Sequence, residues 1–404
     1  MGTPSRCSLT TRCRMPESGS STAGMVDSIA AEREIRGSGP FILEEFKPNV
    51  SYKFKRNPDW YGGPDRPYLD GVEIAIIPDA AQAEAQLKAG NIMLGATLIS
   101  PSNIPALYKS MKDVQLNTSV PAVTGVWSMN HGSTELWKDV RVRRAVSMAI
   151  NRDALADVVY SPGKLKDVGV NARTYWNTPL GPNLGKSWLD PKGKDFGDSG
   201  KYLQFNPAEA KKMLEAAGFT AQKPLAFELC VTPQYWPDDW ESRSQAIQGM
   251  LKEAGIQLSI FNTPYTADWV PNYLRAKAAF KGHKMVPAVA QFTGASKASA
   301  SQTMAVYYTS FGGNTTVGPH FPELEKMITD ERKLLKPEDR FAKQYEIQRW
   351  MAENMPVIPA ASNIDLVDIS QKRLHGPEQY QVYPNGWTGA GAATESIPRW
   401  WLDA

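Results

Sequence analysis

The chain has 404 residues, of which 42% are hydrophobic and 22% charged, and its formal net charge is +3. This length and composition suit a globular protein with one two-lobed domain or two domains. The small net charge gives no support for binding to nucleic acid or to an anionic membrane surface. No run reaches the roughly 20 apolar residues that a membrane span requires.

The N-terminal segment, residues 1–24, is rich in Ser, Thr and Arg and has no hydrophobic periodicity. It lacks the apolar run of about 7–15 residues that an export signal requires, and its composition predicts disorder. Residues 25–36 could form a short helix. The cysteines Cys7, Cys13 and Cys230 have no spacing typical of a disulfide framework or a metal site.

Regular secondary structure is predicted from residue 37 onward. Residues 40–46 and 50–57 alternate apolar with polar side chains, which predicts two strands joined by a turn. After a loop rich in Pro and Gly, residues 72–79 form a further strand. A helix follows, with Asp79 as its N-cap and Gly90 directly after its end.

Strands and helices alternate along most of the remaining chain. Further strands are predicted at residues 123–130, 225–231, 256–261 and 355–361, and helices at residues 139–160, 206–218, 241–254, 267–280, 322–335 and 337–354. Strands and helices that alternate at these spacings predict an α/β layer structure.

The sequence carries little that indicates catalysis. The histidines His131, His283, His320 and His375 are isolated, and none has the i, i+4 spacing of a helical zinc site. No nucleophile elbow, phosphate loop or dinucleotide motif occurs. We therefore predict a protein that is not an enzyme and has no metal and no cofactor.

One group of carboxylates leaves an alternative open. Asp238, Asp239 and Glu241 lie beside Trp236 and Trp240. A glycosidase needs two carboxylates about 5–10 Å apart, but acidic residues are also favoured at a helix N-terminus by the helix dipole. An extracellular hydrolase acting on glycans or peptides is thus the competing hypothesis.

A series of motifs runs in one order along the chain from residue 37. They are GSGPFILEEFKPNVSYKFKRNPDWYGG, PYLDGVEIAIIPDAAQAEAQLKAGNI, LWKDVRVRRAVSMAINRDAL, YLQFNPAEAKKMLEAAGF, QAIQGMLKEAGIQLSI, GGNTTVG, FPELEKMI and ENMPVIPAAS. Together they resemble the solute-binding proteins of family 5, which serve ABC importers of the peptide and nickel type. Each motif alone is moderately specific, and the ordered set is highly specific.

The resemblance implies an α/β, two-lobed, type II periplasmic-binding-protein fold. Lobe I would comprise residues 37–126 and 373–404, lobe II residues 127–372, and residues 1–36 an unmatched tail. Hinge strands would lie near residues 125–130 and 370–374. Family members carry a signal, a first strand of lobe I and a small subdomain ahead of the first motif. We therefore expect a chain that is N-terminally truncated and lacks the first part of lobe I.

The function implied by the resemblance is that of the substrate-binding component of an ABC importer. Such a protein captures a small solute (a peptide, a sugar or a related polar compound) between its lobes and delivers it to a membrane permease. Its partners would be the solute and the permease subunits, without nucleic acid. It would be a monomer located in the periplasm or at the cell surface. A truncated sensor or fragment that does not transport is a further alternative.

The expected ligand contacts follow from the matched strands. They are Trp127, Ser128, Met129 and Asn130 at the first crossover, Tyr235 and Trp236 after a strand end, and Phe292, Thr293 and Lys297 in the segment HKMVPAVAQFTGASKASASQTM. Peptide binders of the family carry in that segment an Asp that pairs with the α-ammonium, whereas here His283 or Lys284 stands there. A desolvated ammonium without a counter-charge is costly, so Lys297 and the hydroxyls predict a polar or anionic solute.

Overall fold

The structure is a computed structural model, and it describes residues 6–10, 38–95, 102–121, 123–129, 131, 134–232, 239–274, 288–295, 299–315, 320–376 and 397–403. The strands are β1 (Arg6–Thr10), β2 (Phe41–Lys47), β3 (Ser51–Arg56), β4 (Gly71–Ala75), β5 (Val114–Ser119), β6 (Val123–Met129), β7 (Thr174–Trp176), β8 (Leu225–Val231), β9 (Ile256–Asn262), β10 (Ala288–Ala295), β11 (Ser362–Ile364), β12 (Leu366–Gln371), β13 (Leu374–His375) and β14 (Trp401–Leu402).

The α-helices are α1 (Ala80–Lys88), α2 (Ile104–Ser110), α3 (Val140–Met148), α4 (Arg152–Tyr160), α5 (Pro162–Lys166), α6 (Pro207–Ala216), α7 (Asp239–Glu253), α8 (Ala300–Tyr308), α9 (Pro322–Glu331) and α10 (Pro337–Asn354). Short 3-10 helices occupy Leu136–Lys138, Pro182–Ser187, Lys194–Leu203 and Ile397–Arg399, and a π-helix occupies Tyr265–Leu274. Strands and helices alternate, as predicted.

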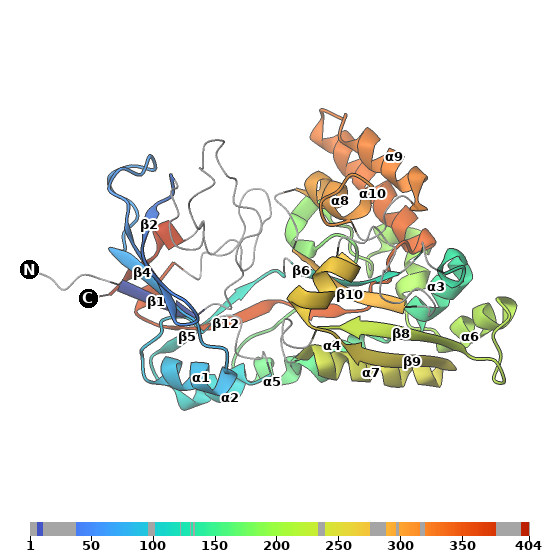
Figure 1. Cartoon of the computed structure of the whole chain (residues 1–404), viewed down its shortest axis with the longest axis horizontal. Coiled ribbons are helices and arrows are strands. Elements are labelled where there is room, and N and C mark those ends of the chain that lie inside the picture. The colour runs from blue at the N-terminus through green and yellow to red at the C-terminus, as the bar shows by residue number, and fades with distance from the viewer. Residues whose placement is uncertain are drawn as a thin grey trace, which may run out of the picture.

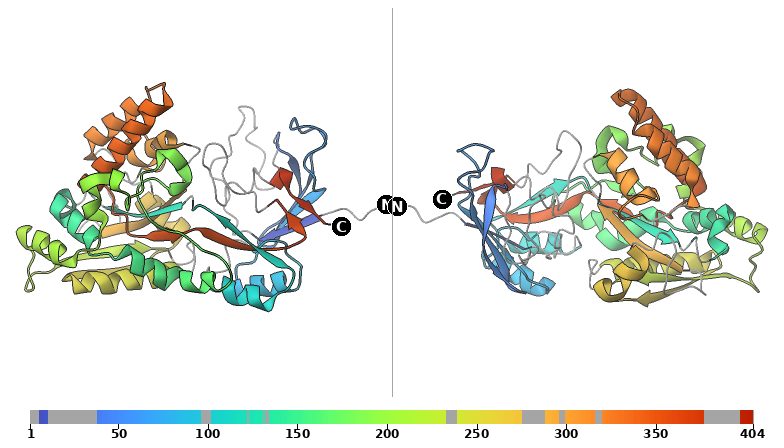
Figure 2. Two further views of the ribbon diagram at one scale, coloured as in Figure 1. Left: turned by 180° about the vertical axis from the view of Figure 1, so that it is seen from behind. Right: turned by 45° about the horizontal axis from the view of Figure 1, so that its top comes forward.

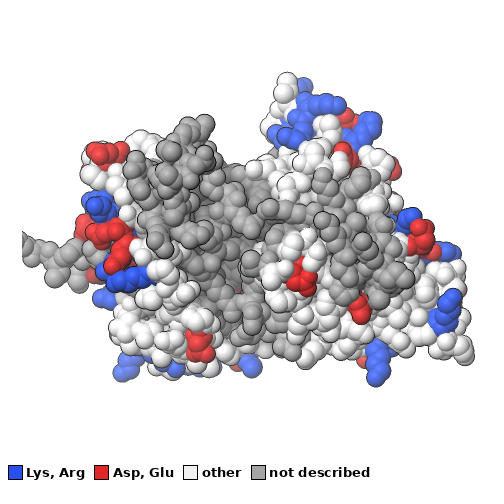
Figure 3. Space-filling model, viewed as in Figure 1, with Lys and Arg blue, Asp and Glu red and all other residues white. Residues whose placement is uncertain are grey.

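These elements form two lobes that lie side by side (Figure 1). The first lobe contains β1 to β5, β12 to β14, α1 and α2, and the second contains β6, β8 to β10 and the remaining helices apart from α5. Helix α5 contacts both α2 of the first lobe and α4 of the second, and the short β7–β11 pair packs against α4. Lysine, arginine and acidic side chains are intermixed on the described surface that Figure 3 shows. None of the described helices has the length and apolar character needed to cross a membrane.

The first lobe is built on a four-stranded sheet of order β1-β4-β3-β2. Strands β2, β3 and β4 pair antiparallel, as their alternating sequences predict. Helix α1 follows, and the Asp79 carboxylate accepts a hydrogen bond of 2.7 Å from the backbone N–H of Gln82. The chain leaves the helix through Gly90, whose φ of +74° suits glycine. The predicted start and end of this helix are confirmed.

The prediction of disorder for the N-terminal segment is wrong for residues 6–10. These residues form β1, which pairs in parallel with β4, with Arg6 opposite Gly71 and Thr10 opposite Ala75. Backbone N–H and C=O groups at a free edge of β4 would otherwise have no strand partner. The short segment RCSLT supplies that partner, although its polar surroundings gave no sign of a strand. The possible helix at residues 25–36 lies outside the described residues.

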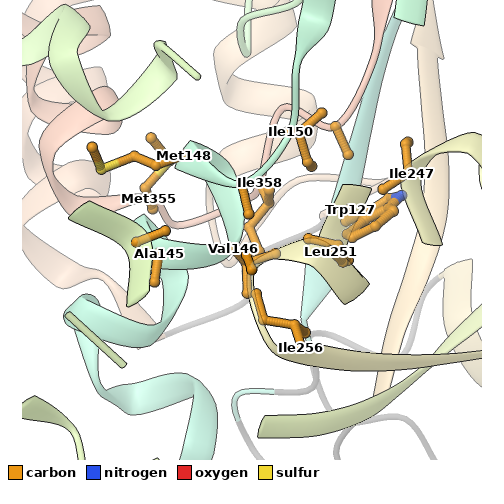
Figure 4. Close-up of a cluster of buried hydrophobic side chains, with 14 of the residues drawn as sticks. Trp127, Ala145, Val146, Met148, Ile150, Ile247, Leu251, Ile256, Met355 and Ile358 are labelled. Atoms are coloured by element: carbon orange, nitrogen blue, oxygen red, sulfur yellow. The ribbon is translucent and has the colours of Figure 1, made fainter. Parts of the chain in front are cut away.

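The second lobe contains a four-stranded sheet of order β6-β10-β8-β9. Strands β8, β9 and β10 run parallel to one another, and β6 is antiparallel to β10. Helices α9 and α10 stand together on one side of the lobe in the views of Figure 2. The largest hydrophobic cluster lies against this sheet and includes the labelled side chains of Figure 4, among them Trp127, Val146 and Leu251.

Two elements predicted from local patterns differ in the structure. The predicted helix at residues 139–160 is interrupted, because Asn151 has φ −82° and ψ 96° and its side chain caps α4 by accepting from the N–H of Ala154 at 3.0 Å. Residues 355–361 do not form a strand. Within them only Ile358 pairs with a strand, through an isolated bridge to Trp127.

The chain passes between the lobes at two places. It leaves β5 at Ser119 and enters β6 at Val123, and it returns from β11 to β12 through Asp365. Strand β12 pairs antiparallel with β5, in the first lobe. Residues 366–371 therefore belong with the first lobe, whereas the sequence placed that boundary at residue 373. Both passages lie slightly ahead of the predicted hinge ranges.

Candidate functional site

The segments expected to contact a solute are neighbours in the second-lobe sheet. Strand β10 pairs with β6 so that Phe292 lies opposite Val126 and Thr293 opposite Gly125. Strand β8, which leads toward Tyr235 and Trp236, runs parallel to β10. The carboxyl ends of β8 and β10 and the start of β6 therefore share the edge at which the chain enters from the first lobe. This is the edge at which α/β sheets bind ligands.

Within β6, the structure places the predicted ligand contacts in the interior of the lobe. Trp127 and Met129 are fully buried in the main hydrophobic cluster, and the Trp127 ring meets the ring of Phe227 edge to face at 6.2 Å. The Trp127 backbone exchanges two hydrogen bonds with Ile358, of 2.8 and 3.0 Å. Ser128 is also buried, at 5% exposure. These side chains hold the strand in place, and a contact with solute stays a prediction for all three.

The other predicted contacts lie wholly or partly outside the described residues. Asn130, Tyr235, Trp236 and Lys297 fall in segments that the structure does not describe. For Phe292 and Thr293 the backbone pairing is described and the side chains are not. The same holds for the carboxylates of the hydrolase alternative, since Asp238 is outside and the side chains of Asp239 and Glu241 are not described.

A second polar region lies on the ribbon formed by β5 and β12. Because successive side chains of a strand point to opposite faces, Val367 and Ile369 face the hydrophobic cluster that α1 and α2 contribute to. In Figure 1 these two helices lie below the ribbon. The intervening residues of β12 therefore face away from α1 and α2.

That opposite face carries Asn117, Asp368 and Ser370. Asp368 and Asn117 are directly opposite one another in the antiparallel register. The side-chain amide of Asn117, a buried residue, donates a hydrogen bond of 2.9 Å to the Ser370 hydroxyl. The half-buried Asp368 carboxylate has no hydrogen bond or ion pair within the described part of the chain. Burial raises the pKa of Asp368 from 3.8 to about 6.

Asp365, three residues earlier, lies between β11 and β12, where the chain returns to the first lobe. Both of its carboxylate oxygens accept hydrogen bonds. Its carboxylate accepts hydrogen bonds of 2.8 Å from the Tyr175 hydroxyl and 2.8 Å from the N–H of Arg173. Burial, with the bond to Asp365, raises the pKa of Tyr175 above its usual range. The Arg173 guanidinium in turn lies 2.7 Å from the Asp190 carboxylate. This network fixes the passage between β11 and β12.

A chain of buried and partly buried polar groups links α7 with β6. The Arg243 guanidinium donates to the Tyr160 hydroxyl at 2.5 Å, and that hydroxyl donates to the Asn363 side chain at 3.2 Å. Asn363 donates to the Asn177 side chain at 2.8 Å, and Asn177 donates to the carbonyl of Gly125 at 3.4 Å. The contacts couple the start of β6 to the β7–β11 pair, at the first passage between the lobes.

The sequence treated the histidines as isolated, but the structure brings two of them together. The rings of His131 and His320 are 5.7 Å apart, and His131 Nε2 lies 3.1 Å from the carbonyl oxygen of Pro356. Burial lowers the pKa of His131 from 6.5 to about 3. Within the residues that the structure describes, no group of three or more His, Cys, Asp or Glu side chains is arranged to hold a metal ion.

Sequence reasoning missed Asp368, although a signal was present. In LVDIS an aspartate sits between Val367 and Ile369, in a strand that carries apolar residues at every second position. Charged groups are seldom placed in half-buried strands without a partner. The pairing of β12 with β5, about which the local sequence says nothing, decides that this aspartate shares a face with Asn117 and Ser370, opposite the face that packs on α1 and α2.

The chain matches one family model, "Bacterial extracellular solute-binding proteins, family 5 Middle", over residues 25–315. This match begins ahead of residue 37, where the motifs begin. Among curated relatives, a probable ABC transporter-binding protein of Deinococcus radiodurans is 30% identical over 55% of this chain and 39% of its own length. The oligopeptide-binding protein AppA of Bacillus subtilis is 32% identical over 45% of this chain and 30% of its own length. The matched part thus spans well under half the length of these relatives.

Solved structures agree on the fold. The ABC transporter substrate-binding protein CtaP of Listeria monocytogenes superimposes with a TM-score of 0.68 at 19% identity, over 91% of this chain and 67% of its own. Bacillus subtilis AppA in complex with a nonapeptide gives a TM-score of 0.67 at 21% identity, over 91% and 66%. The type II periplasmic-binding-protein fold predicted from the sequence is therefore confirmed.

Proposed function

Because the chain belongs to family 5 of the bacterial extracellular solute-binding proteins, we propose that it is the substrate-binding component of an ABC importer. It captures a small polar solute between its two lobes and presents it to a membrane permease. The solute is bound and released without chemical change. Similar proteins carry names that include oligopeptide and dipeptide binding, and solved relatives hold Ni(L-His)2 or agropinic acid.

The observation that carries this proposal is the double connection between the lobes. Two separate passages, from β5 to β6 and from β11 to β12, join bodies that each have their own sheet and hydrophobic clusters. Paired connections of this kind permit hinge closure, in which a few residues at the ends of elements absorb the change in backbone angles. Asp365, Tyr175 and Asn177 hold those ends by hydrogen bonds. The expected motion is closure of the lobes around the solute.

The setting of the chain follows from the same assignment. We propose that it acts outside the cytoplasmic membrane as a monomer, with permease subunits as its protein partners and without nucleic acid. The mixed charges of the described surface (Figure 3) and the net charge of +3 support this, because neither provides a large field of one sign. The hydrolase and the sensor remain the competing functions.

Native mass spectrometry of the full chain, purified without a refolding step, tests the proposal. A solute that co-purifies, leaves on gentle activation and has an unchanged mass after prolonged incubation is the expected result. Small-angle X-ray scattering should show a smaller radius of gyration with this solute than after its removal. A solute that returns cleaved would support the hydrolase. Absence of any bound or added solute that changes the scattering would contradict the proposal.

A further inference from the structure

Asp368 is out of place as a structural residue. Its side chain is half-buried between core residues of β12, and it has neither a hydrogen bond nor an ion pair within the described residues. Its neighbours on the ribbon face, Asn117 and Ser370, are bonded to each other. Burying a carboxylate without a partner lowers stability. A buried charged side chain without a compensating contact is expected at a functional position.

The orientation of Asp368 is set by its two neighbours on β12. Val367 and Ile369, on either side of it, are anchored in the hydrophobic cluster with α1 and α2. Asp368 must therefore point away from those helices, on the same face as its register partner Asn117. The passage that joins the lobes, at Asp365, lies three residues away along the chain. The carboxylate thus lies on the face opposite α1 and α2, close along the chain to one of the two passages between the lobes.

The chemistry of this face is that of a hydrogen-bond acceptor. Asn117 uses its amide N–H group for Ser370, which leaves its Oδ1 oxygen as an acceptor beside the Asp368 carboxylate. No cationic side chain contributes to the raised pKa of Asp368, for which burial is the cause. A lone carboxylate with one amide oxygen is too few ligands for a metal ion, which takes several. A protonated amine or a guanidinium, which brings several N–H donors, fits both acceptors.

We propose that Asp368 is the counter-charge for a cationic group of the solute, an ammonium or a guanidinium, with Asn117 as a second acceptor. This inference rests on the proposed function and specifies its substrate class. It revises the expectation of a polar or anionic solute, which considered only the loop around Lys297. The carboxylate comes from β12 of the first lobe. The sequence of the loop around Lys297 therefore gives no indication of it.

Calorimetry with matched probe pairs tests the inference on the full chain. One pair is L-arginine and L-citrulline, which differ at the guanidinium. The other is L-alanyl-L-alanine and its N-acetyl derivative, which differ at the ammonium. In at least one pair, we expect the cationic member to bind at least about tenfold more tightly than its neutral partner, the ratio typical of one charge-assisted contact. The variant Asp368→Asn should abolish that ratio, whereas Asp198→Asn, at an exposed site, should preserve it.

The outcomes separate this inference from the proposed function. Equal binding of both members of each pair, or a ratio that survives in Asp368→Asn, would overturn the role of Asp368 and leave solute binding intact. The wild-type ratio alone provides this test if the variant does not fold. If no probe binds, the charge of the solute found by native mass spectrometry decides, and a solute without a cationic group overturns the inference. Absence of any solute in both measurements counts against the proposed function itself.

Discussion

Asp368 lies directly opposite Asn117 in the antiparallel register of β12 and β5, yet the amide of Asn117 donates its hydrogen bond to Ser370. Two side chains that could bond to each other are thus arranged so that the carboxylate has no donor among the residues that the structure describes. Asp365, three residues earlier, has two donors. Asp365 therefore stabilises the passage between the lobes, whereas Asp368 is the residue that we propose to bind a ligand.

The first prediction concerns the stability cost of Asp368. Its folded-state pKa of about 6 exceeds the ordinary value of 3.8. The unfolded chain therefore ionises first, and stability falls as the pH rises from about 4 through about 6 and stays reduced above that. We expect Asp368→Asn to raise the free energy of unfolding at pH 7.5 by about 1–3 kcal/mol, with a smaller gain at pH 4.5, measured by urea denaturation.

The matched control for that variant is Asp365→Asn. It removes a carboxylate that accepts from the Tyr175 hydroxyl and the Arg173 N–H, so it should lower the free energy of unfolding by about 1 kcal/mol or more. We therefore expect Asp368→Asn to raise the free energy of unfolding and Asp365→Asn to lower it. A loss of stability in Asp368→Asn at pH 7.5 would show that the carboxylate has a structural role.

The second prediction concerns acid sensitivity at His131. Its side chain is 2% exposed, and burial lowers its pKa from 6.5 to about 3. Above pH 6.5 the residue is neutral in both states. As the pH falls from about 6.5 toward about 3, the His131 imidazole is protonated in the unfolded chain but stays neutral in the folded protein. The free energy of unfolding therefore falls by up to about 4–5 kcal/mol. His131→Gln keeps a donor for the Pro356 carbonyl and does not titrate.

The melting temperature of wild type and His131→Gln should be followed from pH 7 to pH 4. We expect the wild-type temperature to fall more steeply than that of the variant below about pH 6. Parallel curves would contradict a neutral buried imidazole at this position.

The third prediction concerns Arg152, which is 1% exposed. Its guanidinium donates to the carbonyls of Pro359 at 2.6 Å and Leu203 at 2.5 Å, and to the Ser147 hydroxyl at 2.8 Å. Replacing it by methionine leaves those buried acceptors without donors. Arg152→Met should lower the free energy of unfolding by about 3–5 kcal/mol, as measured by urea denaturation with an unchanged m value.

Arg332→Met, at an exposed position at the C-terminal end of α9, serves as its control and should change the free energy of unfolding by less than about 0.5 kcal/mol. Similar losses in the two variants would mean that the cost comes from the lost charge and not from the buried carbonyls.

The fourth prediction concerns β1. Deletion of residues 1–10 removes the strand that pairs with β4, whereas deletion of residues 1–5 leaves it. The longer deletion should speed hydrogen exchange at the backbone amides of residues 71–75 and promote association through the uncovered edge. Exchange mass spectrometry and light scattering measure the two effects. Identical exchange in both deletions would show that β1 does not protect β4.

Local features of the fold could be predicted from the sequence because their causes are local. Asn206 caps α6 by accepting from the N–H of Glu209 at 3.1 Å, and the chain leaves that helix at Gly218 with a φ of +90°. Both positions were expected from capping rules alone. The ordered motifs likewise sufficed for the family and the two-lobed fold.

The residues of the candidate site could not be predicted in the same way. Trp127 and Met129 lie on the expected strand, but their burial against Phe227 depends on packing with distant segments. The sequence did not predict β1, because residues 6–10 form a strand only by pairing with β4. A helix cap needs three or four consecutive residues, whereas a strand needs a neighbour that any part of the chain can provide.

The sequence by itself determined the family, the alternation of strands and helices and most helix ends, since these depend on short patterns read within a few residues. Only the tertiary structure decided that Asp368 lies beside Asn117, on the face away from α1 and α2. The reason is the pairing of residues 366–371 with residues 114–119, because a strand's register with a distant partner determines which of its alternating side chains is buried and which remains available to a ligand.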